Sequence, residues 1–245
     1  MPATIDTTRT RRILLLASNT TTSTQTGWPI GFWWSELTHP YWTFTEAGYE
    51  VDVVSPDGGA LMGDSYRDPA DASGYSAHDL ISLGFMNSPA HRALVENSKA
   101  MADTNLVDYD AVMAIGGQGP MYTFYEDERV HRLLAESHES GKITAAICHG
   151  TCALLKARQS DGTLVVEGKT WTGFANSEED FADGAARVVI QPFRIEVIAR
   201  QIPNTNFIVQ GQFKPHAVRD GNLITGQQQY SGVATAELVI EALGR

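Results

Sequence analysis

The sequence contains few cysteines, and their spacing argues against the usual cysteine frameworks. Only Cys148 and Cys152 occur among 245 residues. Two cysteines at this spacing form neither a CxxC redox pair nor a zinc knuckle, and they offer no basis for a disulfide scaffold. A reducing compartment fits this usage best, so we expect a cytoplasmic protein.

Basic residues and long apolar runs are also scarce. The chain has 18 Lys and Arg against 29 Asp and Glu, a formal net charge of −11, so we expect no nucleic-acid partner and no anionic-membrane partner. No apolar run approaches the length of a membrane span. Residues 1–12 are polar and lack the apolar centre of a signal peptide.

Short apolar runs alternate with longer helix-like segments along the chain. This alternation predicts an α/β fold with a mostly parallel central sheet covered by helices on both faces. The predicted strands cover 13–17, 51–55, 111–115 and 143–147, with a helix over 123–140, a hairpin over 218–225 and a closing helix over 234–243.

The composition favours a single domain over residues 1–245, since 42% of the residues are hydrophobic and no linker divides the chain. Residues 1–11 are predicted to be a flexible tail. Residues 57–89 are rich in Gly, Asp, Ser and Pro with little periodicity, which predicts an irregular excursion that serves as a flap or a dimer arm.

The most informative segment is 145–150, Ala-Ala-Ile-Cys-His-Gly, where a buried strand must turn sharply into a helix. Such a turn raises Cys148 above the sheet edge and directs backbone N–H groups towards it. We therefore expect a thiolate nucleophile, with His149 as a proton acceptor or ion-pair partner. The alternative is a small apolar cysteine buried beneath a helix.

Two other groups are predicted to reach the same edge, because functional groups gather at the carboxyl ends of parallel strands. That rule selects Ser18 and Asn19 after the first strand, and Gly116 and Gly117 after the third. The Gly116–Gly119 turn either presents backbone N–H groups to an oxyanion or is simply a tight turn.

Glu36 lies among four aromatic residues, an environment that raises the pKa of a carboxyl group and allows it to carry a proton near neutral pH. It is equally well explained as a first-turn glutamate that stabilises a helix. Glu178, Glu179 or Asp180 could orient His149 or could cap the following helix, and the local sequence does not choose between them. No metal or other cofactor is expected.

In order along the chain, these segments resemble the ThiJ/PfpI superfamily, in its glyoxalase III-like heat-shock branch. The resemblance extends from Arg12 onward and rests on Gly31-x-x-x-x-Glu36-x-x-His39-Pro40, Gly48–Ser55, Gly116-Gly117-x-Gly119, Ala146–Gly150, Gly168-Lys169-x-x-Thr172-Gly173-Phe174 and Asp220-Gly221-x-Leu223-x-Thr225-Gly226.

The resemblance implies a flavodoxin-like sandwich, usually a homodimer, with Cys148 at a nucleophile elbow. It implies that Glu36 contacts the cysteine, that Glu179 is the third group, and that the amides of Gly117 and His149 hold the oxyanion. It also implies cofactor-free conversion of 2-oxoaldehydes such as methylglyoxal to hydroxy acids such as D-lactate, together with holdase behaviour.

The sequence departs from the family pattern around the expected pocket. Trp33 and Trp34 are bulkier than usual, Gln118 replaces a histidine, and 226–231 replaces Gly-x-Asn-Pro-Ala-Ser. The pocket candidates are Trp33, Trp34, Gln118 and His216. The departures leave open two alternatives: hydration or hydrolysis of a C–N substrate such as an isonitrile or an amide by the same thiolate, and a non-enzymatic stress chaperone or redox sensor.

Overall fold

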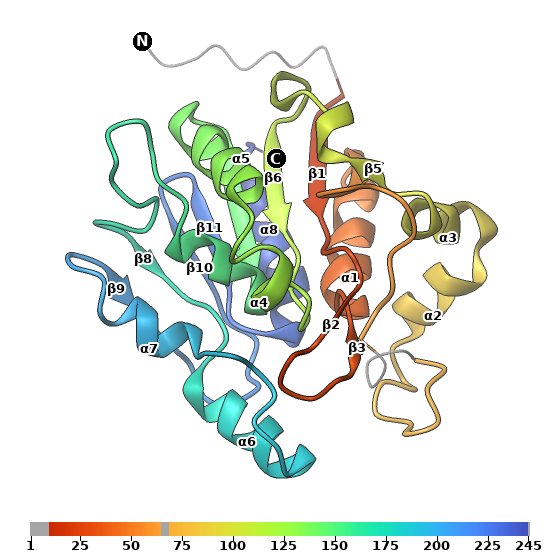
Figure 1. Cartoon of the computed structure of the whole chain (residues 1–245). Coiled ribbons are helices and arrows are strands. Elements are labelled where there is room, and N and C mark those ends of the chain that lie inside the picture. Colours follow the sequence, from red (N-terminus) through yellow and green to blue (C-terminus); the bar gives the residue numbers. More distant parts are fainter. Residues whose placement is uncertain (1–9, 65–68, 245) are drawn as a thin grey trace.

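The computed structural model describes residues 10–64 and 69–244. Within these residues a seven-stranded sheet has the order β10-β11-β7-β6-β1-β4-β5, and only the β10–β11 pair is antiparallel (Figure 1). The sheet strands are β1 (Arg12–Leu16), β4 (Glu50–Ser55), β5 (Lys99–Ala100), β6 (Ala111–Ala114), β7 (Ile143–Ile147), β10 (Ala217–Asp220) and β11 (Leu223–Gly226). Two small two-stranded sheets pair β2 (Thr21–Thr22) with β3 (Pro29–Ile30) and β8 (Thr170–Trp171) with β9 (Asn206–Phe207).

Helices cover both faces of the central sheet, as the alternation of segments predicts. Helices α1 and α8 pack together on one face, and α5 covers β6 and β7 on the other (Figure 1). The helices are α1 (Trp34–Glu46), α2 (Leu80–Asn87), α3 (Pro89–Glu96), α4 (Pro120–Thr123), α5 (Glu128–Glu139), α6 (Asn176–Ala186), α7 (Ile195–Ala199) and α8 (Gly232–Ala242), with 3₁₀ turns η2 (Met101–Asp103), η3 (Leu106–Asp108), η4 (Cys148–Leu155) and η5 (Gln229–Ser231). The predicted flavodoxin-like α/β fold is confirmed.

The central strands are apolar along their whole length because both of their faces are covered. Every residue of β6 and β7 is buried, and β1 exposes only part of Arg12. Parallel strands between two helix layers require such continuous apolar runs, which explains why these strands are visible in the sequence. The predicted hairpin over 218–225 is confirmed as β10 and β11.

The predicted helix over 123–140 is two helices. Helix α4 ends at Thr123, and α5 begins only at Glu128, after the Asp127 side chain caps it by accepting from the Arg129 N–H. The helix expected after Cys148 is the 3₁₀ segment η4.

The segment 57–89 is only partly irregular, so the prediction for it needs correction. Asp79 caps α2 by accepting from the Ser82 N–H, and α2 continues to Asn87. Residues 65–68 of this segment, and residues 1–9 of the predicted tail, lie outside the described part of the chain.

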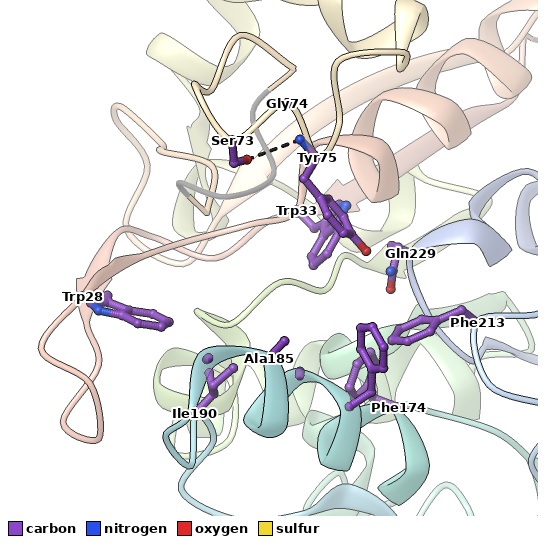
Figure 2. Close-up of a pocket in the computed structure, with 13 residues that line it drawn as sticks. Trp28, Trp33, Ser73, Gly74, Tyr75, Phe174, Ala185, Ile190, Phe213 and Gln229 are labelled. Carbon is purple, nitrogen blue, oxygen red and sulfur yellow. Dashed lines mark hydrogen bonds between the residues drawn. The ribbon is translucent and has the colours of Figure 1, made fainter.

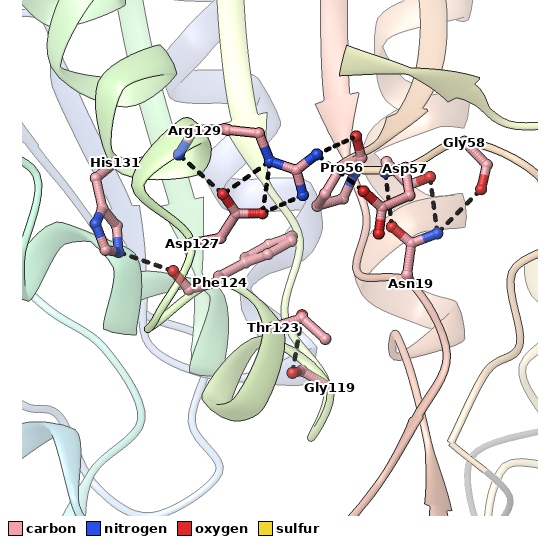
Figure 3. Close-up of polar contacts among 11 residues, drawn as sticks. Asn19, Pro56, Asp57, Gly58, Gly119, Thr123, Phe124, Asp127, Arg129 and His131 are labelled. Atoms are coloured by element: carbon pink, nitrogen blue, oxygen red, sulfur yellow. Dashed lines mark hydrogen bonds and ion pairs between the residues drawn. The ribbon is translucent and has the colours of Figure 1, made fainter. Parts of the chain in front are cut away.

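A polar network joins the loops after β1 and β4 to the start of α5 (Figure 3). Arg129 donates to the carboxylates of Asp127 and Asp57. Asn19 accepts from the backbone N–H of Asp57 and donates to the carbonyl of Gly58. Because Asn19 follows the first strand, it is predicted from the sequence to lie at the same edge of the sheet as Cys148. Its hydrogen bonds to Asp57 and Gly58 show that it links the loops after β1 and β4.

Gly150 allows η4 to lie against the end of β6. A Cβ at this position would be 2.7 Å from the Ala114 carbonyl oxygen and 2.8 Å from the Ile115 carbonyl oxygen. We therefore expect Gly150→Ala to lower the free energy of unfolding by about 1–3 kcal/mol, as for other overpacked sites. Urea denaturation measures this change.

Gly184 in α6 provides the matched control, because a Cβ there would meet nothing within 4 Å. Gly184→Ala should leave stability unchanged or raise it by up to about 1 kcal/mol. If the two substitutions lowered the free energy of unfolding equally, the contact with the end of β6 would not be what requires glycine at residue 150.

Candidate active site

Cys148 is held in a strained turn directly after β7. Its φ is 55°, in the left-handed region that a residue with a side chain rarely adopts. Such a conformation costs roughly 1–3 kcal/mol and persists only where the surroundings impose it. Here the preceding strand is fixed in the sheet, and the Thr151 hydroxyl donates to the Cys148 carbonyl at 2.6 Å. The turn has the geometry of a nucleophile elbow.

His149 joins the sulfur to an acid from a distant segment. Its Nδ1 lies 3.5 Å from Cys148 Sγ, and its Nε2 lies 2.9 Å from Glu179 Oε1. A carboxylate only accepts hydrogen bonds, so the ring hydrogen lies on Nε2 and the Nδ1 lone pair faces the sulfur. The Phe174 ring stacks on the imidazole, with centroids 4.2 Å apart, and fixes its plane.

Glu178 has a different task from Glu179. One of its carboxylate oxygens accepts from the Ala175 N–H, and the other accepts from the Phe213 N–H and from the Gln227 side chain. Burial raises the pKa of Glu178, and these hydrogen bonds oppose the increase. Glu178 therefore links the start of α6 to the segments that carry Phe213 and Gln227, whereas Glu179 contacts His149.

Glu36 reaches the sulfur from the first turn of α1. It is fully buried, and its carboxylate lies close enough to Cys148 to raise the pKa of the thiol. Gly116 makes this approach possible, because a Cβ there would lie 2.3 Å from Glu36 Oε2 and 2.8 Å from Cys148 Cβ. The end of β6 therefore passes beside the pair with no side chain between them.

The surroundings of Cys148 oppose the thiolate that is expected from the sequence at the elbow. Burial and the neighbouring Glu36 carboxylate raise the pKa of Cys148 well above that of an ordinary thiol, while the His149 backbone N–H opposes the increase. The sequence argument weighed only the donors at the turn, but sulfur here is also fully desolvated beside an acid. Cys148 and Glu36 therefore form a buried pair that retains a proton.

Gly117 and Asp64 fix the loop that faces this pair. Gly117 has φ 106°, and a Cβ on it would lie 2.6 Å from the Trp33 nitrogen, so only glycine fits. The two carboxylate oxygens of Asp64 accept separately from the N–H groups of Gly31 and Gln118, at 2.9 and 2.7 Å. Asp64 was not among the predicted residues, because it lies in a segment without periodicity.

A pocket of about 480 Å³ opens beside the site, between α6 and the loop after β3 (Figure 2). A second cavity of about 20 Å³ lies deeper, against His149 and Glu179. Trp33, Phe174, Ala182 and Ile190 line both spaces, so the small cavity is the inner continuation of the large pocket.

The predicted pocket residues divide into two groups. Trp33 lines both cavities, and Gln118 lines the inner one. Trp34 lines neither cavity, and its ring packs edge-on against Phe32 in the core. His216 also lines neither cavity, and its backbone N–H donates to Ser231.

No cluster of three or more His, Cys, Asp or Glu side chains suited to a metal ion occurs in residues 10–64 and 69–244. Over the same ranges, the helices are too short or too polar to span a membrane.

Glu36→Gln should lower the pKa of Cys148, because it removes the negative charge that opposes thiolate formation. A charge at this range shifts a pKa by about 1–3 pH units. The thiolate ultraviolet absorbance of each protein, minus that of its Cys148→Ser counterpart, should therefore rise at a lower pH in the variant. An unchanged midpoint would show that Glu36 does not influence the sulfur.

Asp64→Asn should destabilise the protein, because an amide offers one accepting oxygen where the carboxylate offers two. One buried N–H of Gly31 or Gln118 then loses its acceptor, at a cost of about 1–3 kcal/mol in urea denaturation. Asp57→Asn is the control, since its partner Arg129 is exposed and such pairs contribute less than about 1 kcal/mol. If Asp64→Asn lowered the free energy of unfolding no more than Asp57→Asn does, Asp64 would not hold the two loops together.

Comparison with known proteins agrees with this architecture. Residues 31–242 match the family model described as the DJ-1/PfpI family. The Schizosaccharomyces pombe protein named "Probable glutathione-independent glyoxalase hsp3103" is 28% identical over 237 residues, covering 87% of this chain and 90% of that protein. Glyoxalase 3 of Candida albicans is 27% identical over 233 residues, covering 94% and 97%.

Among solved structures, the Rapid Encystment Protein 24 kDa of Francisella tularensis has the same fold. Its TM-score is 0.85 at 24% identity, and the match covers 96% of this chain and 100% of that chain. The family model spans most of the sequence and includes Glu36, Cys148 and Glu179. The chain belongs to the DJ-1/PfpI family.

Proposed function

We propose that this protein is a glutathione-independent glyoxalase that converts 2-oxoaldehydes to 2-hydroxy acids with Cys148 as nucleophile. The observation that carries the proposal is the position of Cys148, in contact with His149 on one side and Glu36 on the other. Relatives named glutathione-independent glyoxalase or glyoxalase 3, at 25–28% identity, support the same activity.

The first step is addition of the sulfur to the aldehyde carbon. The Cys148 proton passes to Glu36 as the C–S bond forms, so a charged thiolate need not accumulate in a site from which water is excluded. The aldehyde oxygen receives the electron pair and is stabilised by the N–H groups of Gly117 and His149. Glu36 then passes the proton to this oxygen, which gives a neutral hemithioacetal.

The second step moves a proton between adjacent carbons. His149 Nδ1, which is free of hydrogen because Nε2–H is donated to Glu179, removes the proton from the sulfur-bearing carbon. The electrons form an enediol, and return of the proton to the neighbouring carbon gives a thioester of the 2-hydroxy acid. The substrate is isomerised with no external oxidant or reductant.

Water completes the reaction by attacking the thioester carbonyl. His149 takes a proton from the water, the C–S bond breaks as the hydroxy acid leaves, and this proton passes to the sulfur and restores the thiol. The inner cavity of about 20 Å³ has room for about one water molecule beside His149 and Glu179. This position suits activation of that water by the imidazole.

We also infer that residues 1–245 form one domain that acts as a cytoplasmic homodimer. The central sheet draws strands from residues as far apart as Arg12 and Gly226, which supports a single domain. Family membership supports the homodimer.

The purified protein should convert methylglyoxal to lactate without glutathione. Cys148→Ser should lose at least about 1000-fold in kcat, because the nucleophile is removed. Glu179→Gln should lose about 100- to 10,000-fold, because an amide no longer holds His149 in the required tautomer. Lactate formation measured by chromatography provides the readout.

Cys152→Ser is the matched control, since the Cys152 thiol donates to the Pro120 carbonyl at 3.3 Å and lies outside the site. It should retain nearly full activity. A wild-type protein that is inert towards several 2-oxoaldehydes would refute the proposal, and a Cys148 adduct with an isonitrile would then favour the C–N alternative.

A further inference from the structure

The large pocket continues inward to His149 and Glu179. It shares Trp33, Phe174 and two aliphatic residues with the inner cavity, which is lined by His149 and Glu179. A substrate whose carbonyl end lies at the mouth of the inner cavity therefore extends its remaining atoms into the pocket.

The pocket wall is mainly aromatic and comes from segments far apart in the sequence. Figure 2 shows the labelled rings around one hollow, with Tyr75 and Trp33 on the side opposite Phe174 and Phe213. Its aromatic lining residues are Trp28, Trp33, Tyr75, Phe174, Phe181 and Phe213. No charged side chain lines it among the residues that the structure describes. Such a wall favours an uncharged apolar group.

The pocket is large for the smallest oxoaldehydes. If each non-hydrogen atom displaces about the volume of a water, about 30 Å³, the five such atoms of methylglyoxal displace roughly 150 Å³. The pocket volume is about 480 Å³. A methyl substituent would leave most of the aromatic wall in contact with water, whereas a ring or a branched chain would cover it.

Polar groups are concentrated where the carbonyl end would lie. The side-chain oxygens of Gln118 and Gln191 at the inner cavity, and that of Gln229 in the pocket wall, are buried and have no hydrogen-bond partner within the protein. These residues are 5%, 6% and 3% exposed, respectively. A buried amide oxygen without a donor is costly, so these groups suit a ligand that presents a hydroxyl group at one end, as the hemithioacetal formed from an aldehyde does.

We propose that the preferred substrates are 2-oxoaldehydes with a bulky, uncharged apolar substituent, aromatic or branched. The substituent occupies the aromatic pocket, and the two adjacent carbonyl carbons reach the glutamines and Cys148. This inference rests on the proposed glyoxalase function and adds the substrate class of the same site.

The test compares kcat/KM for methylglyoxal, isopropylglyoxal, cyclohexylglyoxal and phenylglyoxal. One methylene in an apolar pocket changes discrimination by about 10- to 200-fold, so the two ring-bearing substrates should exceed methylglyoxal by at least about tenfold. Turnover of methylglyoxal that equals or exceeds that of every larger substrate would overturn the inference and leave the proposed function intact.

Ala185→Trp separates pocket fit from the intrinsic reactivity of each aldehyde. Ala185 lies on the exposed side of α6 and lines the pocket, so an indole there narrows the pocket without touching Cys148. The ratio of kcat/KM for cyclohexylglyoxal to that for methylglyoxal should fall at least about tenfold. Val189→Trp places the same side chain on a nearby exposed residue that does not line the pocket, and it should leave the ratio unchanged.

If no oxoaldehyde is converted, the glyoxalase function fails, and the pocket is tested by itself. Benzyl alcohol carries the apolar ring without an electrophile, and its binding should change the fluorescence of Trp28 and Trp33. The apparent Kd should rise at least about tenfold in Ala185→Trp and stay constant in Val189→Trp. Equal Kd values in all three proteins, or no binding, would overturn the assignment of the pocket.

Discussion

The site depends on two acids that lie side by side and are removed from water. Cys148 and Glu36 are both fully buried, and the carboxylate raises the pKa of the thiol. Two negative charges at this distance in a low-dielectric interior would repel strongly, so the pair holds one charge and one proton. In the proposed mechanism the sulfur becomes a nucleophile when its proton moves to the carboxylate, so no exposed thiolate has to be maintained. The missing side chain at Gly116 allows the two groups to meet.

The parallel sheet brings the components of the site together. The loops after β6 and β7 leave the same edge of the sheet, and they carry Gly117 and Cys148. Asp64 connects the loop that leads into α1 with the loop after β6, because its carboxylate accepts from an N–H of each. Glu36 and the possible oxyanion donors are thereby fixed relative to each other. This preorganisation matters because donors held in place need no rearrangement as charge develops on the substrate.

Burial has opposite effects on the resting protein and on the reaction. It raises the pKa of Cys148, which lowers the supply of thiolate. It also strengthens each hydrogen bond and charge interaction that acts once the sulfur attacks, because little water is left to screen them. The aromatic pocket extends this dry environment outward from His149. In the proposed function, a substrate must therefore displace water from this pocket before its carbonyl end reaches His149.

The sequence by itself determined the parallel α/β fold, the elbow at Cys148 and the family, because continuous apolar strands and ordered short motifs are local properties of the chain. Local sequence also indicated Glu36 as a candidate, but it could not choose between Glu178 and Glu179, for which only the family resemblance gave a preference. Tertiary structure alone decided that Trp33 lines the pocket whereas Trp34 packs in the core, and that Asp64 joins two loops. It also decided that burial and the neighbouring Glu36 raise the pKa of Cys148. Side-chain direction and desolvation depend on segments that meet only when the chain is folded, so no local pattern records them.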